Sequence, residues 1–439
     1  MILEKTEMIC ENLSRSADGE LCLAGVGLKS IAEKFGTPLY LYDEARVRER
    51  CRTYLDAVRE CFGDGGRVLY ASKAASFKRL YEIMHEEGMG IDVVSCGEIR
   101  TALLAGFPLE RAYFHSNNKT DADIDYAIRN GIGYFVVDNA EELYAIDRIA
   151  PVYGKRQKVL LRLTPGIDPH TYAAVATGKV DSKFGSAIET GQADEITRLA
   201  LSLGGVDLAG FHCHIGSQVF DSSVYLQAAD VMLDFVAHIN DTQGYMAREL
   251  DIGGGFGVRY VESQPVIDIA AEIRSVARFM HDKADKLGIC LPTVAFEPGR
   301  SIVADSALTV YTVGTVKNIP GYKTYVSVDG GMADNPRYAL YGSPYTILPV
   351  MGEVGDDAMT CSVVGRCCES GDILQENVPM PRDIRRGDLI ACLTSGAYHY
   401  SMASNYNRLP RPPIVMLRDG ECYIAVRRET EDDIVRLDV

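Results

Sequence analysis

The amino-acid sequence predicts a parallel (β/α)8 barrel followed by a second, antiparallel β domain. Three observations predict this arrangement: a length of 439 residues, eight short apolar runs that alternate with helical segments, and a change of pattern near residue 305. A chain of this length exceeds one ordinary hydrophobic core, so two domains are expected. Eight strand–helix units over roughly 250 residues are typical of a closed barrel.

The eight apolar runs begin at residues 67, 90, 111, 133, 158, 207, 249 and 292. They read RVLYAS, GIDVVS, RAYFHS, GYFVVD, KVLLRLT, DLAGFHCH, ELDIGGG and PTVAFEP. Segments with helical periodicity, such as SFKRLYEIMHEEG and AEELYAIDRIA, lie between them. Strand–helix alternation favours a parallel sheet, so we predict that the barrel occupies residues 46–304.

The C-terminal part, 305–439, has a different pattern of apolar and polar residues. Segments such as LTVYTVGTVKNI, MTCSVVGRCC and DLIACLTSG alternate apolar and polar residues, and the Asp419-Gly420 step is a hairpin signal. We expect this part to form an antiparallel β-sandwich or barrel. An N-terminal segment, residues 1–45, is expected to join the same domain and to add a strand from its GELCLAGVGL stretch. The long connection 165–185 is either a mobile lid or a plain loop.

The composition indicates a cytoplasmic protein that acts on a small molecule. A net charge of -16 argues against nucleic acid or an anionic membrane as a partner. No apolar run approaches the roughly 20 residues of a membrane helix. The N-terminus, MILEKTEMICENLSRS, has acids where a secretion signal has bases. Without secretion, the twelve cysteines are expected to be reduced thiols.

Chemically versatile residues lie at one end of the predicted strands only. They are Lys73, Ser95, His115, Asp138, His214, Gly253 to Gly255 and Glu297. Barrel active sites form at the carboxyl ends of the strands. Lys73, among small residues in YASKAAS, would be costly to desolvate without a partner. Its ammonium could instead simply reach solvent, but the one-sided pattern favours a functional lysine.

Two glycine-containing stretches predict an anion site. DIGGGFG, residues 251–257, lacks the spacing of a dinucleotide-binding motif, but three consecutive glycines allow the backbone to approach a phosphate. A flexible turn is the alternative. EPGRS, residues 297–301, places Gly299 and Arg300 after the eighth strand, where barrels often bind phosphate.

The remaining strand-end residues suit a flat, ring-shaped cofactor. Glu297 could pair with a protonated ring nitrogen, and His214 in HCHIGSQ could stack on the ring. The same stretch is a weak candidate for a metal site, and we predict none. Together, a lysine, a glycine-rich backbone that can hold a phosphate, an acid that can pair with a ring nitrogen and an imidazole that can stack on the ring indicate one cofactor. That cofactor is pyridoxal 5′-phosphate bound as a Schiff base.

Ten motifs resemble, in order, those of the diaminopimelate decarboxylases. They are YASKA, GIDVVSCGE, FHSNNK, DSKFG, FHCHIGSQ, DIGGGFG, EPGRS, DNPRYALYG, CESGD and GAYHYSMASNYN, between about residue 25 and about residue 430. That family belongs to the alanine-racemase-like, fold type III group of pyridoxal phosphate enzymes. The resemblance implies a β/α barrel followed by a β-sandwich domain that takes in the N-terminal strand.

The resemblance also implies a role for each site residue. Lys73 would form the Schiff base, Glu297 would keep the ring nitrogen protonated, and His214 would stack on the ring. The phosphate would be held by Ser217, Gly254, Gly255, Gly299 and Tyr398. The substrate would be bound by Arg300, Arg337, Tyr341, Glu369 and Tyr398, with the first three on its distal carboxylate and Glu369 on its distal amine.

Cys368 would complete the catalytic set of Lys73, His214 and Glu297 as the proton donor. By the same resemblance, Cys368 and Glu369 would reach the active site of a partner subunit, so a homodimer is expected. Cys367 beside Cys368 leaves open which thiol faces the cofactor. Arg366 stands where the family often has proline, and HTYAAVATG, which contains His170, is less polar than the family's usual lid.

The implied reaction is the carboxy-lyase step that converts meso-2,6-diaminopimelate to L-lysine and carbon dioxide, the last step of lysine biosynthesis. The alternative is a decarboxylase of lysine, ornithine, arginine or carboxynorspermidine, against which Arg337 and CESGD count. A further alternative is a catalytically inactive homologue that only binds a partner. Such a protein should have lost Lys73, Glu297 or Cys368, and all three are present. A racemase is disfavoured because the cysteine loop replaces the catalytic tyrosine expected there.

Overall fold

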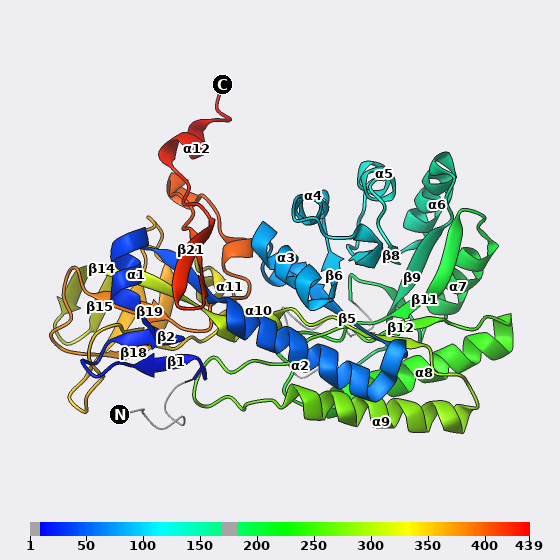
Figure 1. The fold of residues 1–439 in the computed structure, drawn as a ribbon, viewed down its shortest axis with the longest axis horizontal. Coiled ribbons are helices and arrows are strands. Elements are labelled where there is room, and N and C mark those ends of the chain that lie inside the picture. Colours follow the sequence, from blue (N-terminus) through cyan, green and yellow to red (C-terminus); the bar gives the residue numbers. More distant parts are fainter. Residues whose placement is uncertain (1–8, 168–181) are drawn as a thin grey trace. The chain divides into compact units, whose positions relative to one another are not determined.

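The computed structural model describes residues 9–167 and 182–439, which fall into two compact units (Figure 1). The β unit contains the described residues up to Glu49 together with Val258–Val266 and Ile302–Val439. The barrel unit contains the described parts of Arg50–Gly257 and Ile267–Ser301. Residues 258–266 lie between two barrel strands in the sequence and yet belong to the β unit. The domain boundaries at residues 45 and 304 stay a prediction.

The barrel unit contains the predicted closed ring of eight parallel strands. The strands are β5 (Gly66–Ala71), β6 (Gly90–Val93), β7 (Ala112–Phe114), β8 (Tyr134–Val137), β9 (Gln157–Thr164), β11 (Val206–His212), β12 (Glu249–Asp251) and β13 (Thr293–Phe296). They pair in the order β9-β11-β12-β13-β5-β6-β7-β8, and a β8–β9 pairing closes the ring. The predicted barrel is therefore confirmed, strand by strand.

Side chains from six of these strands pack on one another inside the ring. This cluster contains Leu69, Tyr113, Tyr134, Val136, Leu160, Ala209 and Ala295. Successive residues of a strand point to opposite faces, so residues two positions further along the same strand also face inward. Lys73, His115 and Glu297 continue this inward register beyond the carboxyl ends of β5, β7 and β13. The barrel thereby gathers polar groups at one mouth.

Helices cover the outside of the ring (Figure 1). They are α3 (Lys78–Glu87), α4 (Cys96–Leu104), α5 (Asp121–Arg129), α6 (Ala140–Ile149), α7 (Gln192–Ser202), α8 (Ser223–Gln243) and α9 (Ile269–Leu287). Two of them, α4 and α6, begin with a polar cap directly after a strand. The Ser95 hydroxyl accepts from the Glu98 amide at 3.2 Å, so this strand-end serine starts α4.

The β unit is built on a mixed sheet with the order β18-β17-β15-β14-β4-β20-β21. Its strands are β4 (Leu39–Asp43), β14 (Ala307–Ile319), β15 (Lys323–Val328), β17 (Met359–Val364), β18 (Ile373–Met380), β20 (Ile414–Arg418) and β21 (Glu421–Val426). Two further strands, β16 (Ile347–Pro349) and β19 (Leu389–Cys392), pair with each other, and β19 pairs with β14. Most pairs are antiparallel, as predicted, but β15–β17 and β4–β20 are parallel.

The N-terminal segment contributes to the β unit in two ways. The predicted strand stretch forms β2 (Leu21–Leu23) and β3 (Val26–Gly27). Together with β1 (Leu13–Arg15) they make a separate small sheet in which β2 lies between β1 and β3. The strand that enters the large sheet is β4, between β14 and β20. Apolar side chains of the small sheet, of helix α1 (Leu28–Phe35) and of the large sheet share one core.

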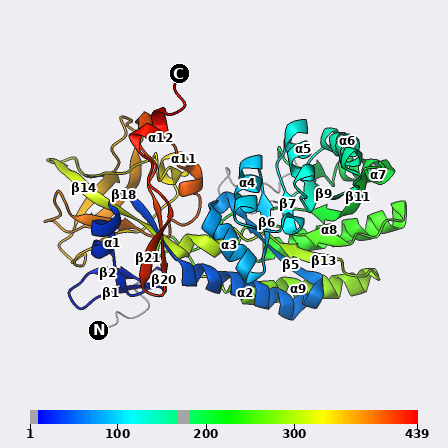
Figure 2. The same ribbon diagram turned by 45° about the horizontal axis from the view of Figure 1, so that its top comes forward.

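The predicted hairpin near the C-terminus is confirmed. Strands β20 and β21 run side by side (Figure 2) and pair antiparallel up to Arg418 opposite Glu421. The two residues between them, Asp419 and Gly420, both have positive φ values, 53° and 80°. Two left-handed residues match the twist of the flanking strands.

Residues 168–181, which make up most of the predicted long connection and include His170, lie outside the described residues, so the choice between a lid and a plain loop stays open. Among the residues that the structure describes, no helix has the length and apolar character needed to span a membrane.

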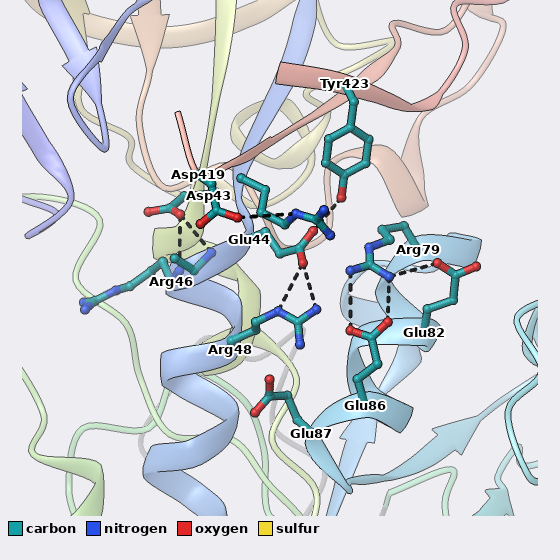
Figure 3. Close-up of polar contacts among 12 residues, drawn as sticks. Asp43, Glu44, Arg46, Arg48, Arg79, Glu82, Glu86, Glu87, Asp419 and Tyr423 are labelled. Carbon is teal, nitrogen blue, oxygen red and sulfur yellow. Dashed lines mark hydrogen bonds and ion pairs between the residues drawn. The ribbon is translucent and has the colours of Figure 1, made fainter. Parts of the chain in front are cut away.

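A buried ion pair within the β unit supports the start of α2 (Glu44–Phe62; Figure 3). Glu44 is fully buried, accepts from Arg48 Nη2 at 2.8 Å and also accepts from the Tyr423 hydroxyl of β21. We expect Arg48→Met to destabilise the protein by about 3 kcal/mol, because it leaves a buried carboxylate without its arginine. The thermal unfolding midpoint should fall by about 6 °C or more.

The matched control is Arg418→Met. Arg418 and its partner Asp419 are 58% and 93% exposed, and such surface pairs contribute less than about 1 kcal/mol. If the unfolding midpoint shifted equally in the two variants, the buried pair of Glu44 and Arg48 would not stabilise the protein more than an exposed pair does.

Candidate active site

The carboxyl mouth of the barrel holds Glu297 between two histidines. His115 Nε2 lies 2.7 Å from Glu297 Oε1, and His212 Nε2 lies 3.1 Å from Oε2. All three side chains are buried, with residue exposures of 6% or less. His115 follows β7, His212 ends β11 and Glu297 follows β13, so three separate strands build the cluster.

The electrostatics of this cluster favour an ionised glutamate. Burial raises the pKa of the Glu297 carboxyl, but the contacts with His115 and His212 outweigh burial and hold the pKa well below its usual range. Burial lowers the pKa of His212 to about 4, so this ring is neutral at neutral pH. The barrel therefore offers a buried anion that keeps its charge.

Lys73 lies in a short 3-10 turn, Ser72–Ala74, directly after β5. Its neighbours Ala71, Ser72, Ala74 and Ala75 are buried, whereas the lysine side chain itself is exposed. The lysine charge contributes, after burial, to lowering the pKa of His214, which places the ammonium in the electrostatic range of that imidazole. His214 is half-buried, and its Nδ1 accepts from the Gly254 amide at 3.4 Å.

The two predicted glycine stretches pack tightly at this mouth. A Cβ atom on Gly254 would lie 1.9 Å from the Glu297 carbonyl oxygen, and one on Gly255 would lie 2.1 Å from the Gly216 carbonyl oxygen. Gly255 also has a φ of +121°, which disfavours any side chain. Only glycine fits here, so the backbone itself lines the site.

Ser217 and Arg300 meet beside these glycines. Arg300 Nη2 donates to the Ser217 hydroxyl at 3.0 Å, and the arginine is 5% exposed. Gly299 precedes Arg300, and a Cβ atom on it would lie 2.9 Å from Ala71 Cβ, against the strand that leads to Lys73. The barrel unit thus brings together the predicted residues Lys73, His214, Ser217, Gly254, Gly255, Glu297, Gly299 and Arg300.

Within the β unit, Arg337 is surrounded by tyrosines. Its guanidinium carbon lies 5.2 Å from the Tyr341 ring centroid and 5.3 Å from the Tyr398 ring centroid. Arg337 begins helix α11 (Arg337–Tyr341) and is 7% exposed. Tyr398 has a φ of +62°, a conformation that costs about 1 kcal/mol and is common at binding sites.

Arg337 has a weak set of partners in the described structure. Its Nη2 donates to the Ser343 hydroxyl at 3.4 Å, while its Nε has no hydrogen-bond partner among the described residues. None of the ion pairs recorded among the described residues, with a limit of 4.0 Å, involves Arg337. A buried guanidinium without a counter-ion is costly, so this site suits an incoming anion.

The predicted cysteine loop also lies in the β unit. Cys368 and Glu369 are exposed, and the Cys368 amide donates to Asn407 Oδ1 at 2.6 Å. Cys367 is buried, and burial raises the pKa of its thiol to about 11. The two neighbouring thiols therefore differ in accessibility.

The sequence matches a family model described as pyridoxal-dependent decarboxylase, pyridoxal binding domain, over residues 44–304. Diaminopimelate decarboxylase of Bacillus subtilis is 42% identical over 423 residues, which is 96% of this chain and 95% of that protein. The chain belongs to the diaminopimelate decarboxylase family. The enzyme of this name from Corynebacterium efficiens is also 42% identical, over 98% of this chain and 93% of its own length.

The fold of this family is also known from solved structures. Diaminopimelate decarboxylase from M. jannaschii, in co-complex with L-lysine, is 30% identical to this chain with a TM-score of 0.90. The match covers 98% of each chain. The predicted barrel with a β-sandwich domain and the predicted class, a pyridoxal-dependent carboxy-lyase, are confirmed.

The barrel mouth fits the pyridoxal phosphate that this family uses. A buried glutamate that stays ionised suits a protonated ring nitrogen. Gly254 and Gly255 leave room that any Cβ atom would fill, as close backbone approach to a phosphate requires. The exposed Lys73 follows a strand whose alternate residues face the barrel interior.

Two residues that contact Glu297, His115 and His212, were absent from the predicted site. The sequence places His115 at a strand end but assigns it no role. A signal was present: His115 lies two positions after the inward-facing Tyr113. His212 follows a register shift between Leu208 and Gly210, which changes the alternation and hides this signal.

Proposed function

We propose that this chain removes carbon dioxide from meso-2,6-diaminopimelate and releases L-lysine, with pyridoxal 5′-phosphate as its cofactor. The observation that carries the substrate assignment is Arg337, a buried arginine with no carboxylate partner among the described residues. A substrate that retains a distal carboxylate provides that partner. Near-full-length relatives with 42% identity that are named diaminopimelate decarboxylase support the same reaction.

Bound pyridoxal phosphate supplies an electron sink for the electron pair that remains when carbon dioxide leaves. In our proposal Lys73 attaches the cofactor, Glu297 holds the proton on its ring nitrogen, and His214 packs on the ring. Ser217, Gly254, Gly255, Gly299 and Tyr398 bind the phosphate. The ionised state of Glu297 supports its role, because an anion at this position favours the protonated ring.

At the far end of the substrate, Arg300, Arg337 and Tyr341 bind the carboxylate that is retained. Tyr398 also contacts the substrate, and Glu369 binds the distal amine. Hydrogen bonds from the Gly371 amide and the Ser370 hydroxyl lower the pKa of Glu369, so it is ionised at neutral pH and complements an ammonium.

Cys368 is the proposed proton donor to the carbon that loses carbon dioxide. Its exposure supports this choice over Cys367, since a donor must reach the reacting atom. Cys367 is enclosed and is therefore assigned to packing.

The reaction is tested with the purified protein loaded with pyridoxal phosphate. Meso-diaminopimelate, lysine, ornithine, arginine and carboxynorspermidine are supplied in separate assays, and products are identified by mass spectrometry. We expect lysine and carbon dioxide from meso-diaminopimelate alone. A diamine product from another substrate, with diaminopimelate unchanged, would overturn the assignment of the distal carboxylate site.

We further propose that the enzyme is a homodimer in which Cys368 and Glu369 act in the partner's site. Lys73→Ala and Cys368→Ala should then each be inactive alone. Co-expressed, they should recover about a quarter of wild-type activity, because half of the dimers are mixed and each mixed dimer has one intact site. Absence of recovery in a preparation shown to contain mixed dimers would contradict shared sites. The cytoplasmic location stays a prediction.

A further inference from the structure

The carboxylate of Glu297 is held at both oxygens by histidines on two different strands. His115 approaches Oε1 at 2.7 Å and His212 approaches Oε2 at 3.1 Å. The two imidazole rings pack edge to face, with centroids 5.0 Å apart and planes at 74°. Each ring thus supports the other against rotation.

The two histidine contacts restrict the rotation of the Glu297 carboxylate about its terminal side-chain torsion. The terminal torsion of a glutamate is broad, so a single hydrogen bond leaves the plane of the carboxylate loosely defined. The hydrogen bond from His212 to Oε2 and the close contact of His115 with Oε1 together restrict that plane. Because a carboxylate has about four lone-pair positions, acceptor capacity remains for a ligand.

The spacing of His115 Nε2 and Glu297 Oε1 is shorter than a metal-binding arrangement needs. Two histidines and a glutamate are a common ligand set for zinc, with bond lengths near 2.1 Å. Ligand atoms around a tetrahedral ion of this size are about 3.4 Å apart. The 2.7 Å between His115 Nε2 and Glu297 Oε1 leaves no such space.

The protonation of His212 is also defined by this site. Since the ring is neutral, it carries a single N–H, which lies on Nε2 because that atom faces the carboxylate. Its Nδ1 has no hydrogen-bond partner among the described residues. His212 therefore serves Glu297 and no other described polar group.

We propose that His115 and His212 are positioning residues that orient Glu297 toward the ring nitrogen of the bound cofactor. The proposal rests on the role proposed above for Glu297. Other charged or titratable groups that act on this cluster lie on or directly after the barrel strands; they are Asp92, Asp138, Arg162, Cys213, His214 and Asp251.

The test compares leucine and glutamine at each histidine. Glutamine retains an N–H donor near the position of Nε2, whereas leucine removes it. The readout is the visible absorbance of bound pyridoxal phosphate, titrated with pH, alongside kcat. In His115→Leu and in His212→Leu we expect the acid-side midpoint to rise by about one pH unit, because only one histidine then opposes the rise that burial causes in the pKa of Glu297.

We expect kcat at neutral pH to fall at least tenfold in the leucine variants and the glutamine variants to restore both readouts. Glu297→Gln is the reference for complete loss of the anion. Tyr113→Phe is the matched control, since it removes a buried hydrogen bond to a different glutamate, Glu249. It should lower thermal stability without moving the spectral midpoint.

Two outcomes would overturn the proposal: leucine variants with the wild-type midpoint, or glutamine variants that match Glu297→Gln. The second remains decisive if the leucine variants do not fold. The spectral titration needs no substrate, so it is independent of the product assay. If the histidine variants show the expected shift of the spectral midpoint but the wild-type enzyme forms no lysine from meso-diaminopimelate, the proposed substrate is wrong. The positioning role of the histidines would still stand.

Discussion

Lys73→Ala is expected to abolish the visible absorbance band of the bound cofactor and to lower kcat by at least about a thousandfold. The structure supports this expectation because Lys73 lies just beyond the strand β5, with its side chain exposed among buried small residues. Alanine removes the only atoms at this position that could bond to the cofactor. Pyridoxal phosphate should then be lost on gel filtration, as measured by absorbance and by mass spectrometry of the intact protein.

The control for this variant is Lys78→Ala. Lys78 lies at the start of α3, is 60% exposed and pairs with Glu82 at 3.4 Å, so its loss should leave the spectrum and kcat unchanged. A visible band that persists in Lys73→Ala would refute the assignment of Lys73 as the attachment site.

The barrel could be predicted because each of its strands is a short apolar run that ends in a polar or glycine residue. Alternation along a strand then places some site residues without a structure: Glu297 lies two positions after the inward-facing Ala295. The same rule fails at His212. The irregular pairing between Leu208 and Gly210 shifts the alternation, and a glycine inside a strand, which often marks a bulge, is a weak sign of that shift.

The β unit was harder to predict because its sheet joins distant segments. LYLYD, residues 39–43, is buried along its whole length and lies between β14 and β20. Its parallel pairing with β20 depends on a partner more than 370 residues away, since Tyr40 lies opposite Ile414. Similarly, the two thiols of Cys367 and Cys368 are adjacent in the sequence, and only the fold distinguishes the buried one from the exposed one.

Arg337→Met is expected to lower kcat/KM for meso-diaminopimelate by about a thousandfold, which corresponds to about 4 kcal/mol of lost binding to the transition state. The thermal unfolding midpoint should stay constant or rise. Both expectations follow from the same observation, a buried guanidinium with one weak hydrogen bond and two tyrosine rings as its described partners. Without substrate, this charge is a cost to the folded protein, and an apolar side chain of similar length removes that cost.

The combination of the two readouts separates a binding residue from a structural one. An arginine in a structural ion pair would lose stability on replacement, because its partner carboxylate would remain buried and uncompensated. Arg337→Lys sharpens the comparison, since it keeps the charge but loses the planar, two-pronged geometry that matches a carboxylate. We expect it to recover part of kcat/KM. Tyr338→Phe, one residue along α11, is the local control and should change neither readout. A lowered unfolding midpoint with unchanged kcat/KM in Arg337→Met would show that this arginine supports the fold and that the distal carboxylate is bound elsewhere.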